Sequence, residues 1–214
     1  MNALSFGLGR PRRLRRFAVL LGLAAFLTLL AGRLIPAMAG TADTRWPDGV
    51  VHVYDDSGMT DTIITAAHRW TVSGAKVDVE VVADRKDADV IVRIDDRRLL
   101  RLCGRDCLGY SMSIGRPGDG HSEVLMRSSL GGDPRPLSVW VAAHELGHVL
   151  GLHHRDGQHC SVMSPRAFET NCAPSLAASR PTSDELACVP APADVDVAAA
   201  LYGGAAATRD PRCQ

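Results

Sequence analysis

The chain has 214 residues and no formal net charge at pH 7, and its 46% hydrophobic and 22% charged content exclude an intrinsically disordered protein. The first 39 residues contain six arginines and no acidic residue, so the remaining 175 have a net charge of −6. A mildly acidic body without a basic run excludes a typical nucleic-acid-binding protein, and its length predicts one domain rather than two.

The first 39 residues contain the three parts of an export signal. A basic stretch, Arg10 to Arg16, precedes an apolar run, Phe17 to Gly32, and the small-residue sequence Ala37-Met38-Ala39 follows. We therefore expect a signal peptide over residues 1–39, cleavage after Ala39 and a secreted, extracellular domain over residues 40–214. The alternative is a membrane anchor over residues 17–35, but the apolar run of 16 residues is shorter than the roughly 20 that a spanning helix needs.

The first half of the exported chain predicts an α/β arrangement. Residues 50–54 are typical of a short strand between turn residues, and apolar residues from Ile63 to Trp70 recur at helical spacing until Ser73 and Gly74. Residues 77–82 and 90–94 alternate apolar and charged side chains, which predicts two strands with one buried face. The order strand, helix, strand, strand opens an α/β sandwich.

The second half predicts two more strands and three helices. The expected elements are strands over 108–114 and 123–127, a long helix over 137–152 capped by Ser138, a short helix opened by Thr182 to Glu185, and a helix over 194–202 ended by Gly203 and Gly204. Pro190 and Pro192 interrupt the last two helices.

All six cysteines follow the leader, and their even number predicts disulfides in an exported protein. Sequence alone leaves the pairing open, although proximity favours Cys103–Cys107, Cys160–Cys172 and Cys188–Cys213. A cysteine zinc site is the alternative, but the chain contains no C-x2-C pair.

The segment from His144 to His154 indicates the chemistry. His144 and His148 are four residues apart, which places both rings on one face of a helix, and Glu145 lies beside them without being a ligand. Gly151 can turn the chain back so that His154 completes a set of three nitrogen ligands and leaves the fourth position for water. A register slip would make His153 the ligand instead. The pattern predicts peptide hydrolysis by a zinc-bound water that Glu145 activates as general base.

The pattern H-E-x-x-H-x-x-G-x-x-H, followed by Ser161-Val-Met163-Ser-Pro165, resembles the metzincin zinc peptidases, and the proline after the methionine is similar to their matrixin-like branch. The resemblance implies an α/β (α+β) fold with a twisted mixed sheet, two long helices, an active-site helix followed by a methionine turn, and a C-terminal helix. It also implies that Met163 packs beneath the ligand rings. A substrate would lie antiparallel to the edge strand at 108–114, beside a pocket lined by residues 165–168.

The chain also departs from that family. No propeptide with a switch cysteine precedes the catalytic region, and no structural zinc or calcium ligands are recognisable between residues 95 and 125. The cysteine set favours a bacterial secreted relative. The aspartate pairs Asp55-Asp56 and Asp95-Asp96 could hold Ca²⁺, but their position beside turn residues favours solvated turns. Calcium is therefore unassigned.

We conclude from the sequence that the chain is a secreted zinc endopeptidase that acts on protein or peptide substrates. We expect one catalytic Zn²⁺, held by His144, His148 and His154, with Glu145 as general base. We expect a monomer with no nucleic-acid partner and no membrane contact after signal cleavage. The alternatives are a non-catalytic secreted binding module stabilised by zinc and a membrane-tethered protein with a peptidase fold.

Overall fold

The computed structural model describes residues 44–131, 134–155, 161–165 and 188–207. The predicted signal peptide and the predicted short helix at 182–185 lie outside the described residues. Within them, no helix is both long enough and apolar enough to span a lipid bilayer.

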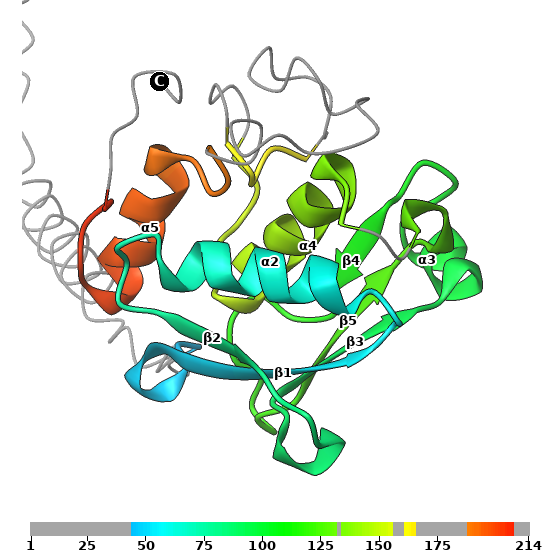
Figure 1. The fold of residues 1–214 in the computed structure, drawn as a ribbon, viewed down its shortest axis with the longest axis horizontal. Helices are drawn as coiled ribbons and strands as arrows, with labels where there is room; N and C mark the ends of the chain where they lie inside the picture. Colours follow the sequence, from blue (N-terminus) through cyan, green and yellow to red (C-terminus); the bar gives the residue numbers. More distant parts are fainter. Residues whose placement is uncertain (1–43, 132–133, 156–160, 166–187, 208–214) are drawn as a thin grey trace, which may run out of the picture. The chain divides into compact units, whose positions relative to one another are not determined.

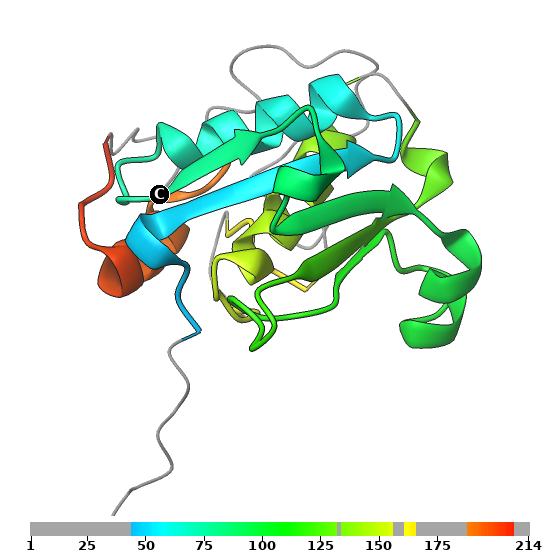
Figure 2. The ribbon, with the colours of Figure 1, turned by 90° about the horizontal axis from the view of Figure 1, so that it is seen from below.

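A five-stranded mixed β-sheet is the centre of the fold (Figures 1 and 2). Its strands are β1 (Val50–Asp56), β2 (Asp78–Val81), β3 (Val90–Ile94), β4 (Gly109–Ser111) and β5 (Ser122–Met126). The order across the sheet is β2-β1-β3-β5-β4. The first four strands in that order run parallel, whereas β4 pairs with β5 in the antiparallel sense and forms one edge.

The described residues form four α-helices that accompany the sheet. They are α2 (Thr60–Thr71), α3 (Asp96–Leu102), α4 (Pro136–Val149) and α5 (Pro192–Tyr202). Figures 1 and 2 show α2 and α4, the two longest, side by side on the same face of the sheet. This is the mixed α/β architecture with two long helices that the sequence predicts.

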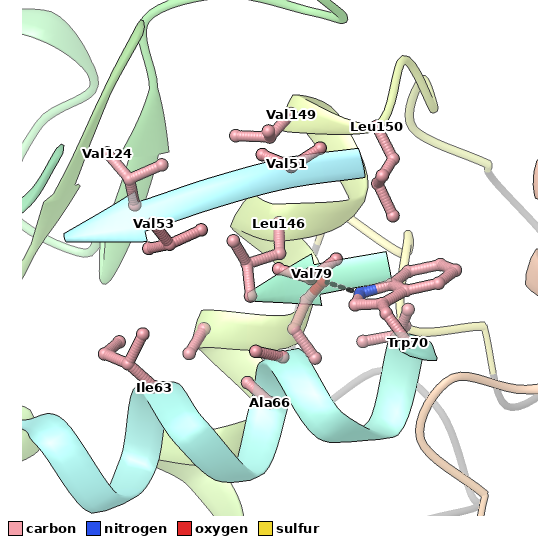
Figure 3. Packing of buried hydrophobic residues seen from close by; sticks show 14 of the residues in the cluster. Val51, Val53, Ile63, Ala66, Trp70, Val79, Val124, Leu146, Val149 and Leu150 are labelled. Carbon is pink, nitrogen blue, oxygen red and sulfur yellow. Dashed lines mark hydrogen bonds between the residues drawn. The ribbon is translucent and has the colours of Figure 1, made fainter. Parts of the chain in front are cut away.

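The core lies between the sheet and these two helices (Figure 3). Val51 and Val53 point from β1 toward the helices and are fully buried, as the alternation along the strand requires. Trp70, at the end of α2, is also fully buried, and its indole Nε1 donates a hydrogen bond to the carbonyl of Ala143 in α4 over 2.9 Å. This hydrogen bond joins the two helices and opposes sliding of α4 along its own axis relative to α2.

Three sequence-based predictions need correction. Ser138 is not the N-cap of the long helix, because the helix begins at Pro136 and the Ser138 hydroxyl accepts a hydrogen bond from the Arg135 amide one turn earlier. The strand predicted over 108–114 is shorter: β4 contains only 109–111. The sequence analysis also missed α3, because its only buried residue is Leu99 and its other side chains are mainly charged.

The predicted Cys103–Cys107 disulfide is present between α3 and β4. Cys188 is also disulfide-bonded, but its predicted partner Cys213 lies outside the described residues. The predicted pair Cys160–Cys172 lies outside them too.

Candidate metal centre and cleft

The helix α4 holds the first two histidines and the glutamate of the motif in the core. The exposed fractions of His144, Glu145 and His148 are only 7%, 4% and 8%. Gly147 lies on the same helix, where an added Cβ would be 2.4 Å from the sulfur of Met163. The methionine is fully buried and therefore packs directly against α4 at Gly147.

The turn after α4 brings the third histidine back toward the first two. Gly151 has φ of 97°, in the left-handed region that favours glycine. The Gly151 amide donates to the His148 carbonyl and the Leu152 amide to the Gly147 carbonyl, both over 2.9 Å. This pair of bonds is the Schellman motif that ends many helices. The chain then continues to His154 instead of extending the helix away from the site.

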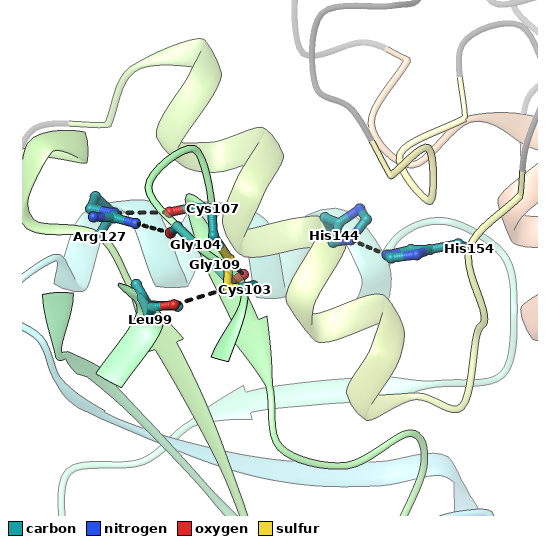
Figure 4. The surroundings of a disulfide bond; sticks show 8 residues. All are labelled: Leu99, Cys103, Gly104, Cys107, Gly109, Arg127, His144 and His154. Atoms are coloured by element: carbon teal, nitrogen blue, oxygen red, sulfur yellow. Dashed lines mark hydrogen bonds between the residues drawn. A yellow bond between two sulfur atoms is a disulfide. The ribbon is translucent and has the colours of Figure 1, made fainter. Parts of the chain in front are cut away.

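The three histidines converge through their Nε2 atoms. The Nε2 of His154 lies 3.1 Å from that of His148 and 3.3 Å from that of His144, and Figure 4 draws the second of these contacts. A tetrahedral zinc ion with Zn–N distances of about 2.0–2.1 Å would separate two ligand nitrogens by roughly 3.3–3.4 Å. His153 lies in the same cleft but is not part of the cluster. The cluster could therefore hold a metal ion without rearrangement.

Backbone carbonyls fix the orientation of the two buried rings. The Nδ1 of His144 donates to the Val162 carbonyl over 2.6 Å, and the Nδ1 of His148 donates to the Leu152 carbonyl over 2.7 Å. Because each Nδ1 carries the proton, each Nε2 keeps its lone pair for a metal. Burial, with a smaller contribution from the other histidines, lowers the pKa of His144 to about 3, and burial also lowers the pKa of His148. Both rings are therefore neutral at pH 7.

A buried carboxylate supports the turn that supplies the Val162 carbonyl. Asp194, in the first turn of α5, accepts hydrogen bonds from the Ser161 hydroxyl over 2.5 Å, the Val162 amide over 2.7 Å and the Ala191 amide over 3.1 Å. Sequence analysis missed this residue, since nothing in the local pattern distinguishes it from an ordinary acidic residue at a helix start.

The carboxyl group of Glu145 is buried and only partly hydrogen-bonded. Its Oε2 is buried and has no hydrogen-bond partner within the described part of the chain, which is rare for a carboxyl oxygen inside a protein. Burial raises the pKa of Glu145 to about 8, and backbone hydrogen bonding by Ser111 partly opposes this rise. A bound cation would lower the pKa again.

An open cleft of about 1090 Å³ gives access to the cluster. It is lined by His144, Glu145, His148 and His154, by Cys103 and residues 106–114, and by Trp140, Val141, His153 and Pro165. Pro165 is the one residue of the predicted pocket at 165–168 that lies among the described residues. The edge strand β4 forms part of the wall, where the resemblance implies that a substrate lies.

The first residue of each aspartate pair acts in a turn or a cap. Asp55 accepts hydrogen bonds from Ser57 and Thr60, and Asp95 caps α3 through the Arg98 amide. Asp96 accepts hydrogen bonds from the hydroxyl and amide of Ser128, which lower the pKa of Asp96.

Comparisons with known proteins add little to this geometry. No family model and no curated protein matches the sequence. Two solved structures of myroilysin are similar, one at 18% identity over 53% of both chains and one at 16% identity over 53% of this chain and 48% of the other, each with a TM-score of 0.38. The matched region is thus about half the length of those structures.

Proposed function

We propose that the chain is a secreted zinc-dependent endopeptidase of the matrixin-like metzincin type. One observation carries the proposal: the Nε2 atoms of three histidines converge in a cleft that is also lined by Glu145, whose buried Oε2 has no hydrogen-bond partner among the described residues. The eleven-residue motif of the sequence and this arrangement support the same activity.

The donor atoms fit zinc better than calcium. Three neutral imidazole nitrogens suit a transition metal such as zinc, whereas calcium and magnesium prefer oxygen ligands. His144, His148 and His154 would hold the ion. A zinc ion in this position supplies a Lewis acid that polarises a peptide carbonyl and lowers the pKa of water toward about 7.

Glu145 performs the proton transfers. Its Oε2 accepts a proton from the water that attacks the peptide carbonyl, and the same oxygen then donates this proton to the leaving nitrogen. Burial favours the protonated carboxyl between the two transfers. The cleft cysteines, Cys103 and Cys107, are bonded to each other, so neither supplies a thiolate nucleophile. The reaction is direct hydrolysis without a covalent intermediate.

An extended peptide is the substrate that the cleft fits best. β4 is the edge of the sheet, so one side of its backbone has no neighbouring strand among the residues that the structure describes. An antiparallel peptide can pair with such an edge through main-chain hydrogen bonds, independently of most of its side chains. We therefore propose protein and peptide substrates for a monomeric enzyme.

A non-catalytic zinc-stabilised module is the alternative from another class. Structural zinc sites are usually closed by a fourth protein ligand. Among the described residues, the cluster contains only the three histidines. Glu145 would also have no purpose in such a site, because burying an unpartnered carboxyl oxygen destabilises a fold.

A casein digestion assay tests the activity. Purified 40–214 should digest casein, and a zinc chelator should abolish the digestion. Glu145→Gln keeps the shape of the side chain but removes the base, so we expect turnover to fall by about 10²–10⁴ while zinc content stays constant. Gly118→Ala is the matched control, because its added Cβ contacts nothing within 4 Å. Wild-type turnover in Glu145→Gln would refute the mechanism.

N-terminal sequencing of the exported protein tests its location. A chain that begins at Gly40 supports secretion after cleavage. An exported chain that retains residues 17–35 and sediments with membranes would support the tethered alternative.

A further inference from the structure

The first residue of β4 lies directly against the carboxyl group of Glu145. A Cβ added at Gly109 would be 2.6 Å from Oε1 and 2.8 Å from Cγ of Glu145, and 2.9 Å from Cγ1 of Val141. Non-bonded atoms do not approach this closely without displacement. Gly109 does not have the positive φ of the chain's turn glycines. Glycine is therefore required here by the available space and not by backbone conformation.

Three sets of contacts hold this end of β4 in place, and Figure 4 shows the disulfide and the bonds of the Arg127 guanidinium. The Cys103–Cys107 disulfide closes the loop that leads into the strand. The Arg127 guanidinium donates to the carbonyls of Cys107 over 2.8 Å and Gly104 over 3.1 Å. The Arg127 amide donates to the Leu108 carbonyl over 2.9 Å, which continues the pairing of β4 with β5. The strand therefore cannot easily retreat from Glu145.

The helix α4, which carries Glu145 on the other side of this contact, is also held in place. Glu145 and Val141 lie one turn apart on α4 and are both buried, with exposed fractions of 4% and 3%. The Trp70 indole holds the backbone of the same helix through the Ala143 carbonyl. A side chain at position 109 would therefore have to displace the Glu145 carboxyl and the Val141 methyl group rather than the helix backbone.

We propose that Gly109 is a positioning residue for Glu145. Its lack of a side chain lets the braced edge strand lie on Oε1, which confines the carboxyl to one place and leaves Oε2 as the oxygen available for proton transfer. The catalytic part of this inference rests on the proposed function. The contact itself does not, because it concerns only the packing of two residues of this chain.

Gly109→Ala tests the catalytic part, with Gly118→Ala as control. The new methyl group points toward Glu145, so we expect kcat to fall about 10–100-fold, KM to change less than about threefold, and bound zinc to remain equal to that of the wild type. A merely structural role would lower the amount of folded enzyme without changing the kcat per bound zinc. A kcat per zinc equal to that of Gly118→Ala would overturn the proposal.

A double-mutant cycle in the metal-free protein tests the contact separately from peptidase activity. We expect Gly109→Ala to lower Tm by roughly 3–10 °C in the wild-type background. In the Glu145→Ala background, where the obstructing carboxyl is gone, the loss should be less than half as large. Equal losses in both backgrounds would overturn the positioning role, whether or not casein is digested.

Failure of the single variant to fold is also informative. If Gly109→Ala does not fold but Gly109→Ala/Glu145→Ala does, the coupling is established. If neither folds while Gly118→Ala does, the obstruction lies outside Glu145 and the proposal is wrong.

Discussion

At the residue scale, the histidine cluster depends on the partners of the ring nitrogens as much as on their spacing. The separation of His144 and His148 predicts that they share a helix face, and the structure has them there. The Val162 and Leu152 carbonyls that orient the rings are not predictable, because any residue type offers a backbone carbonyl. Sequence therefore identifies the candidate ligands, whereas the fold determines which nitrogen of each ring faces the site.

Replacement of adjacent histidines tests the choice of the third ligand. His154→Ala should lower bound zinc strongly, because it removes one of three converging nitrogens. His153→Ala should leave zinc content close to that of the wild type, since His153 is outside the cluster. Equilibrium dialysis followed by metal analysis measures both variants. A loss of zinc in His153→Ala with none in His154→Ala would show that the register is shifted by one residue.

Asp194 predicts a pH dependence of stability. Burial raises the pKa of its carboxyl, although hydrogen bonds from Ser161, Val162 and Ala191 oppose this rise. A raised pKa in the folded state means that the folded protein loses stability relative to the unfolded chain as pH rises above the unfolded value of about 3.8. The Asp194→Asn variant lacks this titratable carboxyl, so its stability does not have this pH dependence.

Between pH 4 and pH 7, the Tm of the wild type should therefore fall relative to the Tm of Asp194→Asn. Thermal denaturation of both chelated proteins over this range measures the effect. If the Tm of the wild type instead rises relative to that of Asp194→Asn as pH rises, the hydrogen bonds and not burial determine the direction in which the pKa of Asp194 is shifted.

At the element scale, strands and helices with a regular apolar period were predictable, and short or charged elements were not. The alternation in β3 and the helical spacing in α2 come directly from burial of one face. α3 has no such pattern because it buries one residue. β4 was predicted too long, since its apolar sequence continues to Ile114, whereas its pairing with β5 ends after one further hydrogen bond, from the Met112 amide to the Glu123 carbonyl. Pairing partners depend on the whole sheet and not on local sequence.

The turn at Gly151 is the element on which the third ligand depends. An added Cβ there would meet nothing closer than 3.5 Å, so replacement would introduce conformational strain without a steric clash. We expect Gly151→Ala to lower stability by about 1–2 kcal/mol and to weaken zinc binding. Gly151→Asn should lose less, because asparagine tolerates the left-handed region better. Urea denaturation and zinc titration of both variants measure this, and equal losses would contradict the explanation.

At the scale of the whole molecule, the sheet and its two long helices bring together residues that are far apart in the chain. Glu145 meets β4, some 35 residues earlier, and the Val162 turn meets Asp194, some 30 residues later. Such long-range contacts leave no periodic signal in one sequence. The motif alone could predict that the three histidines come together, but it could predict neither Gly109 against Glu145 nor the Asp194 carboxyl behind the turn at Val162.

X-ray absorption at the zinc edge of purified 40–214 tests the central claim most directly, because it reports the number and type of atoms around the ion. The account predicts one zinc per chain with three imidazole nitrogens at about 2.0–2.1 Å and one light-atom ligand from solvent. His154→Ala should lose one imidazole contribution. Sulfur scattering, or a fourth protein ligand that persists in the presence of a competitive inhibitor, would contradict the proposed open catalytic site.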